Sequence, residues 1–148
     1  MHLAQLNLGR IRGPLEHPAL QDFVNLLEPI NALADESPGF VWRLQTDEGD
    51  ATAIRVFGND MLLVNLSVWE DVESFRTFVF GDEHRAALRR RAEWFAKMDP
   101  PHTVLWWIPE GHVPTVEEAN ERLALLRSRG ATAQAFPLVR PFPEPSSQ

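Results

Sequence analysis

The order of strand-like and helix-like patterns in this sequence predicts an α+β protein with one four-stranded antiparallel sheet. Three segments, 2–8, 40–45 and 61–69, alternate in character as half-buried strands do, and a fourth apolar segment occupies 103–108. Apolar residues at helical spacing separate the first strand from the second and the third from the fourth. The resulting β-α-β-β-α-β order is that of the ferredoxin-like fold, in which the first and third strands lie side by side in the centre of the sheet.

The first helix is expected to begin near Pro18, because proline is favoured in the first turn of a helix. Apolar residues recur at helical spacing over 20–34, Pro29 should kink the helix, and the turn at 37–39 should end it. Between the second and third strands, 53–57 is a candidate for an additional short strand that two turns enclose.

The second helical segment is predicted to be broken. Asp71 is a suitable N-cap residue, and an apolar stripe follows over 72–79. Gly81 interrupts this pattern. A further helix is expected from about Glu83 to Met98, where a pair of prolines follows and stops it.

The C-terminal part is predicted to add one helix and a tail. Thr115 and Glu118 have the spacing of a capping box, and Gly130 is a typical residue after a helix end. A last short strand is a candidate at 134–139. Because the final residues are rich in proline, we expect one domain over 1–136 and an extended tail over 137–148.

The composition excludes several classes of function. The 148 residues suit one domain, and a formal net charge of −7 argues against a broad nucleic-acid surface. The absence of cysteine excludes disulfides, thiolate metal sites and a cysteine nucleophile, and the absence of tyrosine removes any mechanism that needs a protein phenol. The chain has no apolar run of roughly 18 residues, and because the stretch MHLAQLNLGR (1–10) is short and polar we expect no signal peptide. We therefore expect a cytoplasmic protein without membrane or nucleic-acid partners.

Alternation along the strands gives the predicted sheet one wholly apolar face and one mixed face. Gln5 and Asn7 on the first strand share the mixed face with Asn65 and Ser67 on the third. Equivalent or compatible strand positions also carry large apolar residues, namely Leu3, Leu63, Trp69, Leu105 and Trp107. A face that meets only water seldom carries so much apolar area. We expect a second subunit to cover the mixed face; the alternative is that this face lines a cavity.

His84 is the strongest single candidate for chemistry. It shares one helical face with Leu88, Arg91, Phe95 and Met98. An imidazole titrates near neutral pH and can act as a general base or a metal ligand. The alternative, which the residues alone favour slightly, is a packed histidine at a helix start that is hydrogen-bonded to the backbone. No histidine pair in the sequence has metal-ligand spacing.

Four arginines, Arg85, Arg89, Arg90 and Arg91, lie close together in the sequence but fan out around a helix. A solvated helical face is the expected interpretation. The functional alternative is that Arg91 holds a carboxylate or a haem propionate at the mouth of a pocket.

Two segments that a short break separates resemble the dimeric α+β barrel superfamily, namely SVWEDVESFRTFV (67–79) and EHRAALRRRAEWF (83–95). This superfamily includes the antibiotic-biosynthesis monooxygenase-like proteins. The segments 3–10 and 106–136 resemble one bacterial branch of unassigned function. The resemblance covers residues 2 to about 136. It implies a homodimer in which two sheets pack face to face, with helices outside and a ligand pocket between each sheet and its helices.

The resemblance also implies roles for individual residues. Haem-degrading members use an asparagine on the first strand, and a tryptophan and a histidine after the third. Asn7 fits the first position, His84 lies in the region of the histidine but not in clean register with it, and Phe78 stands near the tryptophan position. Cofactor-free oxygenases rely on asparagine and tryptophan, for which Asn7, Trp69 and Trp42 are candidates. The cofactor expected from the resemblance is therefore none or haem.

Two functions are consistent with these residues. The first is a small-molecule-binding, monooxygenase-like enzyme for an apolar or aromatic substrate, with Asn7 and His84 as catalytic residues. The second is a noncatalytic ligand-binding or stress-related homodimer in which the same residues only pack. The expected substrate-binding residues are Trp42, Asn65, Ser67, Trp69, Phe78, Leu88 and Arg91.

Overall fold

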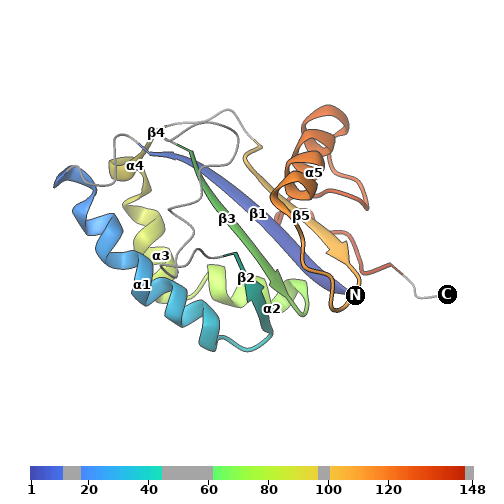
Figure 1. The fold of residues 1–148 in the computed structure, drawn as a ribbon, viewed down its shortest axis with the longest axis horizontal. Helices are drawn as coiled ribbons and strands as arrows, with labels where there is room; N and C mark the ends of the chain where they lie inside the picture. The colour runs from blue at the N-terminus through green and yellow to red at the C-terminus, as the bar shows by residue number, and fades with distance from the viewer. Residues whose placement is uncertain (12–17, 45–61, 97–100, 146–148) are drawn as a thin grey trace.

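The strands pair into one antiparallel sheet whose centre is β1 (His2–Ile11) and β3 (Leu62–Trp69), as the computed structural model in Figure 1 shows. β2 (Phe40–Arg43) pairs with β3, and β5 (Thr103–Ile108) pairs with the other edge of β1. The order β2-β3-β1-β5 confirms the predicted ferredoxin-like arrangement. The structure describes residues 1–11, 18–44, 62–96 and 101–145, so the strand expected at 53–57 lies outside the described residues.

The first helical segment follows the sequence prediction closely. A single 3-10 turn, η1 (Pro18–Leu20), leads into α1 (Gln21–Glu36), which continues through Pro29. At its end, the backbone N–H of Ser37 donates to the Ala34 carbonyl at 3.0 Å. The buried Ala34 and half-buried apolar residues of α1 face the sheet.

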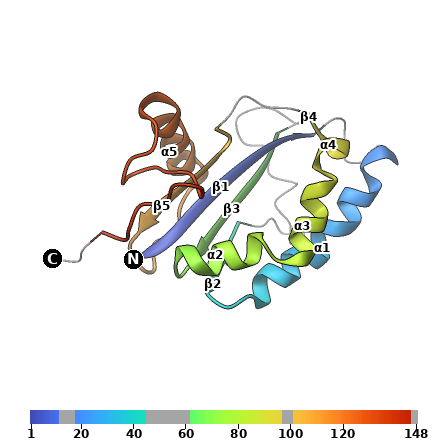
Figure 2. The ribbon, with the colours of Figure 1, turned by 180° about the vertical axis from the view of Figure 1, so that it is seen from behind.

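The second helical segment is divided more finely than expected. α2 (Val72–Val79), α3 (Asp82–Arg89) and α4 (Arg91–Trp94) are followed by β4 (Phe95–Ala96), so the expectation of one helix from Glu83 to Met98 is wrong. The backbone leaves the helix after α4 because β4 pairs with the end of β1. Figure 2 shows α2, α3 and α4 following one another along one side of the sheet. The predicted N-cap is confirmed, since the Asp71 carboxylate accepts from the Ser74 N–H at 2.7 Å.

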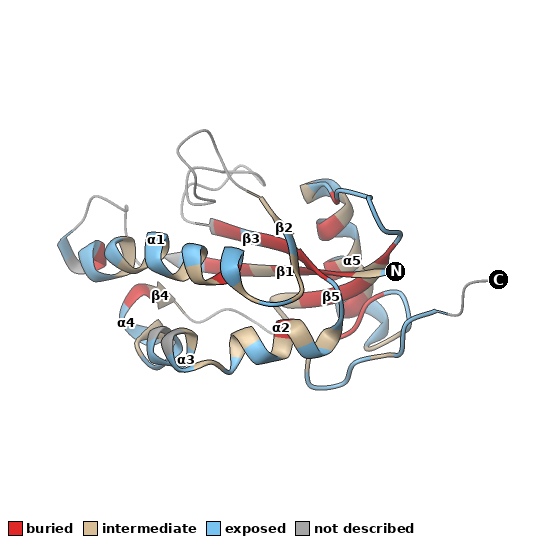
Figure 3. Ribbon diagram, turned by 90° about the horizontal axis from the view of Figure 1, so that it is seen from below, coloured by how far each residue is buried: buried red, intermediate tan, exposed pale blue. Residues whose placement is uncertain are grey.

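The chain's own helices cover the mixed face of the sheet. Residues of this face pack against α1, α2 and α4 in two clusters, which centre on Trp69 and Trp94. α5 (Val116–Arg129) lies on the opposite, apolar face, over β5 and β1 (Figure 3). The expectation that a second subunit covers the mixed face is therefore wrong. The mixed face lies inside one chain, which agrees with the alternative that it lines a cavity.

The residues after α5 return to the sheet. Phe136 exchanges backbone hydrogen bonds with Leu105, a single bridge where a strand was a candidate at 134–139. Phe142 packs beside Phe136, and its carbonyl accepts from the Trp107 indole at 3.0 Å. The described part of the tail thus contacts the domain, while the boundary at 136 stays a prediction. In the described part of the chain, no helix has the length and apolarity that a membrane crossing needs.

Candidate ligand pocket

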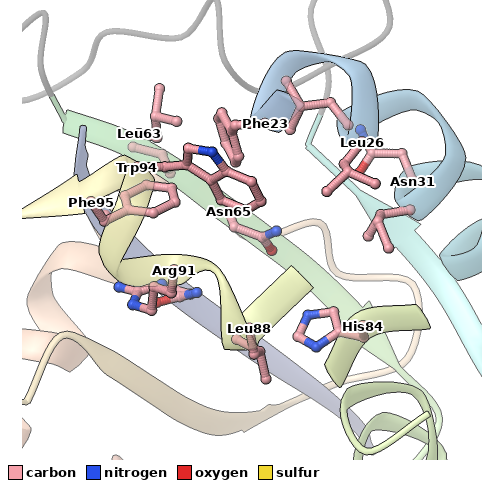
Figure 4. A pocket seen from close by; sticks show the side chains of 15 residues that line it. Phe23, Leu26, Asn31, Leu63, Asn65, His84, Leu88, Arg91, Trp94 and Phe95 are labelled. Carbon is pink, nitrogen blue, oxygen red and sulfur yellow. The ribbon is translucent and has the colours of Figure 1, made fainter. Parts of the chain in front are cut away.

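A cavity lies between the mixed face of the sheet and the helices α1, α3 and α4 (Figure 4). It has two adjoining compartments, of about 170 and 350 Å³. Both are lined by Asn7, Ile30, Asn31, Asn65, His84, Leu88 and Arg91. The smaller compartment has an apolar end that includes Phe23, Leu63, Trp94 and Phe95, and the larger one reaches Ser67, Trp69, Phe78, His102 and Thr103. These volumes suit a small molecule rather than a polymer.

The polar floor of the cavity is built by the register of the two central strands. Gln5 lies opposite Ser67, and Asn7 lies opposite Asn65. The Gln5 amide nitrogen donates to the Asn65 side-chain oxygen and to the Ser67 hydroxyl, both at 2.7 Å. The Trp69 indole N–H also donates to Ser67, at 2.9 Å. This network holds the side-chain oxygen of Asn65 and leaves its NH2 group for a ligand.

Asn7 is held in the same manner from the other neighbouring strand. The Thr103 hydroxyl donates to the Asn7 side-chain oxygen at 3.1 Å. In the described part of the chain, neither the Asn7 nor the Asn65 amide nitrogen donates a hydrogen bond within the protein. Two NH2 groups therefore remain available to a ligand oxygen on the floor of the cavity.

His84 stands at the start of α3, on the helical side of the cavity. Its Nδ1 lies 3.1 Å from the Val79 carbonyl oxygen. A carbonyl only accepts, so Nδ1 carries the proton, and in the neutral ring Nε2 keeps a lone pair. Burial lowers the pKa of His84 from its ordinary value, although the hydrogen bond to Val79 acts in the opposite direction. The imidazole is therefore neutral at pH 7 and can accept a proton.

Arg91 is the arginine that lines both compartments of the cavity. Its guanidinium carbon lies 4.8 Å from the centre of the Phe95 ring, and among the described residues it makes no ion pair or hydrogen bond. Burial lowers the pKa of Arg91 from its ordinary value. The preceding Arg90 is different, because it pairs with Glu93 at 2.7 Å and with Asp22 at 2.8 Å on the surface.

The structure brings most of the predicted site residues together. Asn7, Asn65, Ser67, Trp69, Phe78, His84, Leu88 and Arg91 all line the cavity. The aromatic pair is packed in place: the rings of Trp69 and Phe78 stack with centres 5.2 Å apart, and Phe78 lies 5.0 Å from the His84 ring. Whether these residues bind a substrate remains a prediction.

Trp42 is the exception, because it lies on the opposite side of the sheet. It pairs with Val68 and packs against the apolar cluster beneath α5. Phe40, two residues earlier, lies on the mixed face against Trp69, with ring centres 5.4 Å apart. An irregularity in the pairing between Phe40 and Trp42 separates the two residues that simple alternation places on one face. The assignment of Trp42 to the pocket is therefore corrected.

Several lining residues were not predicted as site residues. Asn31 and Thr103 add polar groups, and Arg43 reaches the larger compartment while pairing with Asp35 at 2.8 Å. His102 also lines this compartment, and its Nδ1 is buried without a hydrogen-bond partner among the described residues. Asn31 carries a sequence signal, since it follows Leu27 by one helical turn on the apolar stripe. Arg43 carries one too, because alternation along 40–45 predicts it on the mixed face, where it pairs with Ser67. His102 carries none, because only the tertiary fold brings it to the cavity.

The described residues form a ferredoxin-like α+β fold with a pocket between the polar-lined face of the sheet and its helices. The chain belongs to the family described as domain of unknown function (DUF3291), whose family model matches residues 2–148. No protein of curated function matches the sequence.

Solved structures show the same fold at low sequence identity. A conserved protein from Methanosarcina mazei Go1 is similar with a TM-score of 0.53 and 14% identity over 71% of this chain and 88% of its own. SnoaB, a cofactor-independent oxygenase from Streptomyces nogalater, is similar with a TM-score of 0.52 and 16% identity over 74% of this chain and 94% of its own. A candidate antibiotic biosynthesis monooxygenase from Nitrosomonas europaea has a TM-score of 0.53 and 10% identity, covering 74% and 92%. At these identities the similarity establishes the fold alone.

Proposed function

We propose that this protein binds a small aromatic molecule in the cavity and oxidises it with molecular oxygen, as a cofactor-independent, monooxygenase-like enzyme. One observation supports this above the others: the half-buried His84, whose Nδ1 is bonded to Val79 and whose Nε2 keeps its lone pair, lines a cavity whose floor offers two unused amide NH2 groups. That arrangement places a base and hydrogen-bond donors around one small ligand. The fold of SnoaB, a cofactor-independent oxygenase, is compatible with this chemistry.

The proposed reaction uses the acidity of a ring methylene beside a carbonyl, as in anthrone. His84 Nε2 removes a proton from the methylene, and the electron pair is delocalised onto the carbonyl oxygen as an enolate. The amides of Asn7 and Asn65 donate to that oxygen. The carbanion adds O2 to give a substrate peroxide anion, which takes the proton back from His84; loss of water from the resulting hydroperoxide leaves a second carbonyl. The balance is CH2 + O2 → C=O + H2O, with the substrate supplying all the electrons.

Oxygen consumption with anthrone tests this proposal. Wild-type protein should consume one O2 for each anthraquinone formed. His84→Gln should reduce the rate by about 10²–10⁴-fold, the usual contribution of a general base. Asn7→Ala should abolish turnover, because one amide donor is lost. His112→Gln is the matched control, since His112 is exposed and pairs with Glu118 away from the cavity. Equal rates for wild type and His84→Gln would contradict the proposal.

Haem is the alternative cofactor. A histidine that donates its Nδ1 proton to a carbonyl and keeps Nε2 free is the usual arrangement of a metal-bound imidazole, so His84 would hold the haem iron. Arg91 would hold a propionate. Haem, when bound, would supply the activation of oxygen. Titration with hemin distinguishes the two versions: a Soret band that His84→Ala removes supports haem, and a protein that gains no band refutes it.

The second candidate function is ligand binding without catalysis, in a homodimer. It is favoured by the hydrogen bonds among the side chains of the cavity floor, where Ser67 accepts from both Gln5 and Trp69. Side chains that bond to one another in this way can serve packing alone. In this case the protein binds aromatic molecules but shows no oxygen consumption with anthrone or quinol substrates. We also propose the homodimer and the cytoplasm as the state and place in which the protein acts.

A further inference from the structure

The charges that line the cavity contrast with those of the chain. The sequence contains 21 acidic and 14 basic residues, which gives a net charge of −7. No aspartate or glutamate is among the described residues that line either compartment, whereas Arg43 and Arg91 both do. The cavity is thus a positively charged region in an acidic protein, and such a region attracts anions.

Arg91 is the source of the uncompensated charge. The other arginine of the cavity, Arg43, is matched by Asp35 at 2.8 Å. The contact that the structure shows for the Arg91 guanidinium is the face of Phe95. A half-buried cation without a counter-ion is costly, and a ring contact offsets only part of that cost. A ligand that carries an anionic group would remove the cost on binding.

The positions of Arg91 and His84 limit the shape of such a ligand. His84 lies in the first turn of α3 and Arg91 begins α4, so the two side chains line the cavity from separate helical turns. Figure 4 shows both side chains on the same side of the cavity, with Phe23, Leu26 and Asn31 of α1 opposite them. A flat ligand between these walls can therefore contact both residues at once.

We propose that the ligand is an aromatic carboxylate of two or three fused rings, whose carboxylate pairs with Arg91 and whose opposite end carries the acidic hydrogen that meets His84. This inference rests on the proposed function and names the class of its substrate. Arginine binds carboxylates through two parallel hydrogen bonds, so the recognition is directional as well as electrostatic. The rings lie against the apolar end of the cavity, near Trp94.

Calorimetric titration with two matched probes tests the inference. The first is 6-hydroxy-2-naphthoate, which carries a carboxylate and a hydroxyl at opposite ends, and the second is the neutral 6-hydroxy-2-naphthamide. Wild-type protein should bind the naphthoate about tenfold or more tightly than the naphthamide, because a charge-assisted pair adds to the same ring contacts. The hydroxyl ends are identical, so the ratio of the two Kd values isolates the anionic end.

Arg91→Gln should bind both probes with the affinity of the naphthamide, while Arg91→Lys should retain part of the preference because it keeps the charge. Arg89→Gln is the matched control: Arg89 is exposed on the same helical segment and does not line the cavity, so the preference should be unchanged.

The outcomes separate this inference from the proposed function. Equal Kd values in wild type, or a preference that survives in Arg91→Gln, would overturn the anionic site while aromatic binding stands. If neither probe binds, the proposal that the cavity binds aromatic molecules is overturned, and with it the proposal that the ligand carries a carboxylate.

Discussion

At the scale of single residues, His84 unites two interpretations that the sequence presents as alternatives. The predicted backbone hydrogen bond is confirmed, since Nδ1 donates to Val79. The same bond directs the unprotonated Nε2 away from the backbone, and the ring lines the cavity. A histidine at a helix start can therefore be structurally anchored and chemically available at the same time, because its two nitrogens serve different partners.

Acidification should destabilise the protein through His84. Burial lowers its pKa below the ordinary 6.5, so the unfolded chain takes up this proton at a higher pH than the folded chain. The contribution of the neutral ring is present above about pH 6.5 and is lost as the pH falls below it. In urea unfolding between about pH 7.5 and pH 5, the free energy of unfolding should fall more steeply for wild type than for His84→Gln. Parallel slopes would remove His84 as the cause.

Ser67 should be the most sensitive hydroxyl of the cavity floor. It is buried and accepts hydrogen bonds from Gln5 and Trp69. Ser67→Ala leaves the Trp69 indole N–H without its acceptor, which should lower the free energy of unfolding by about 1–3 kcal/mol. Ser128→Ala, an exposed serine that bonds only to the Leu125 carbonyl, should change it by less than about 0.5 kcal/mol in the same chemical denaturation.

At the scale of elements, the close contact between β1 and β4 shapes the apolar end of the cavity. Gly9 lies where a side chain would meet the Phe95 ring, since a Cβ added there would stand 2.5 Å from Cε1 of that ring. Phe95 in turn contacts Phe23, with ring centres 5.1 Å apart, and carries the guanidinium of Arg91 on its face. The absence of a side chain at Gly9 therefore positions both a wall and an arginine of the cavity.

Gly9→Ala should push the Phe95 ring into the cavity. We expect a loss of about 1–3 kcal/mol in the free energy of unfolding, as overpacking usually causes, and weaker binding of 6-hydroxy-2-naphthoate. The double variant with Phe95→Leu removes the contacting atoms and should recover stability relative to Gly9→Ala alone, so the two substitutions should be coupled. Additive effects in this cycle would show that the contact does not limit the cavity.

At the scale of the whole molecule, α5 limits the area of the sheet that a second subunit could cover. It packs on β5 and β1, on the apolar side of the sheet that would lie inside a dimer of two packed sheets. Trp42 of β2 and Leu44, which follows β2, are only partly buried on that face, and Val41 of β2 is 40% exposed. The half of the sheet that includes β2 is therefore the part that a second copy would cover, with α5 at its border.

The homodimer is expected to be detectable at micromolar concentration. Sedimentation equilibrium should give a mass of about twice the 16.8 kDa of one chain. Leu44→Lys should shift the equilibrium toward the monomer, because it places a charge on the face that a second copy would cover. Glu117→Lys, an exposed change on α5 at a distance from β2, is the control and should leave the mass unchanged. A mass near that of one chain for wild type at this concentration would refute the dimer.

Much of the architecture follows from local patterns in the sequence. The alternation in β1 and β3 predicts which residues share the mixed face, because successive side chains of a strand point to opposite sides whatever the strand pairs with. Asn7, Asn65 and Ser67 meet for this reason. Asp71 and Thr115 begin their helices as predicted, since an N-cap hydrogen bond spans only three residues.

Other features depend on contacts between distant segments, and only the tertiary structure decides them. The pairing irregularity in β2 moves Trp42 to the opposite face, and the pairing of β4 with β1 ends the helix before Met98. Arg90 forms an ion pair with Asp22 of α1, whereas the neighbouring Arg91 forms no ion pair among the described residues. Local periodicity determines the face of a helix or strand on which a side chain lies. The charged groups and the free volume around that side chain depend on which distant segment packs against the face, and only the tertiary fold decides this.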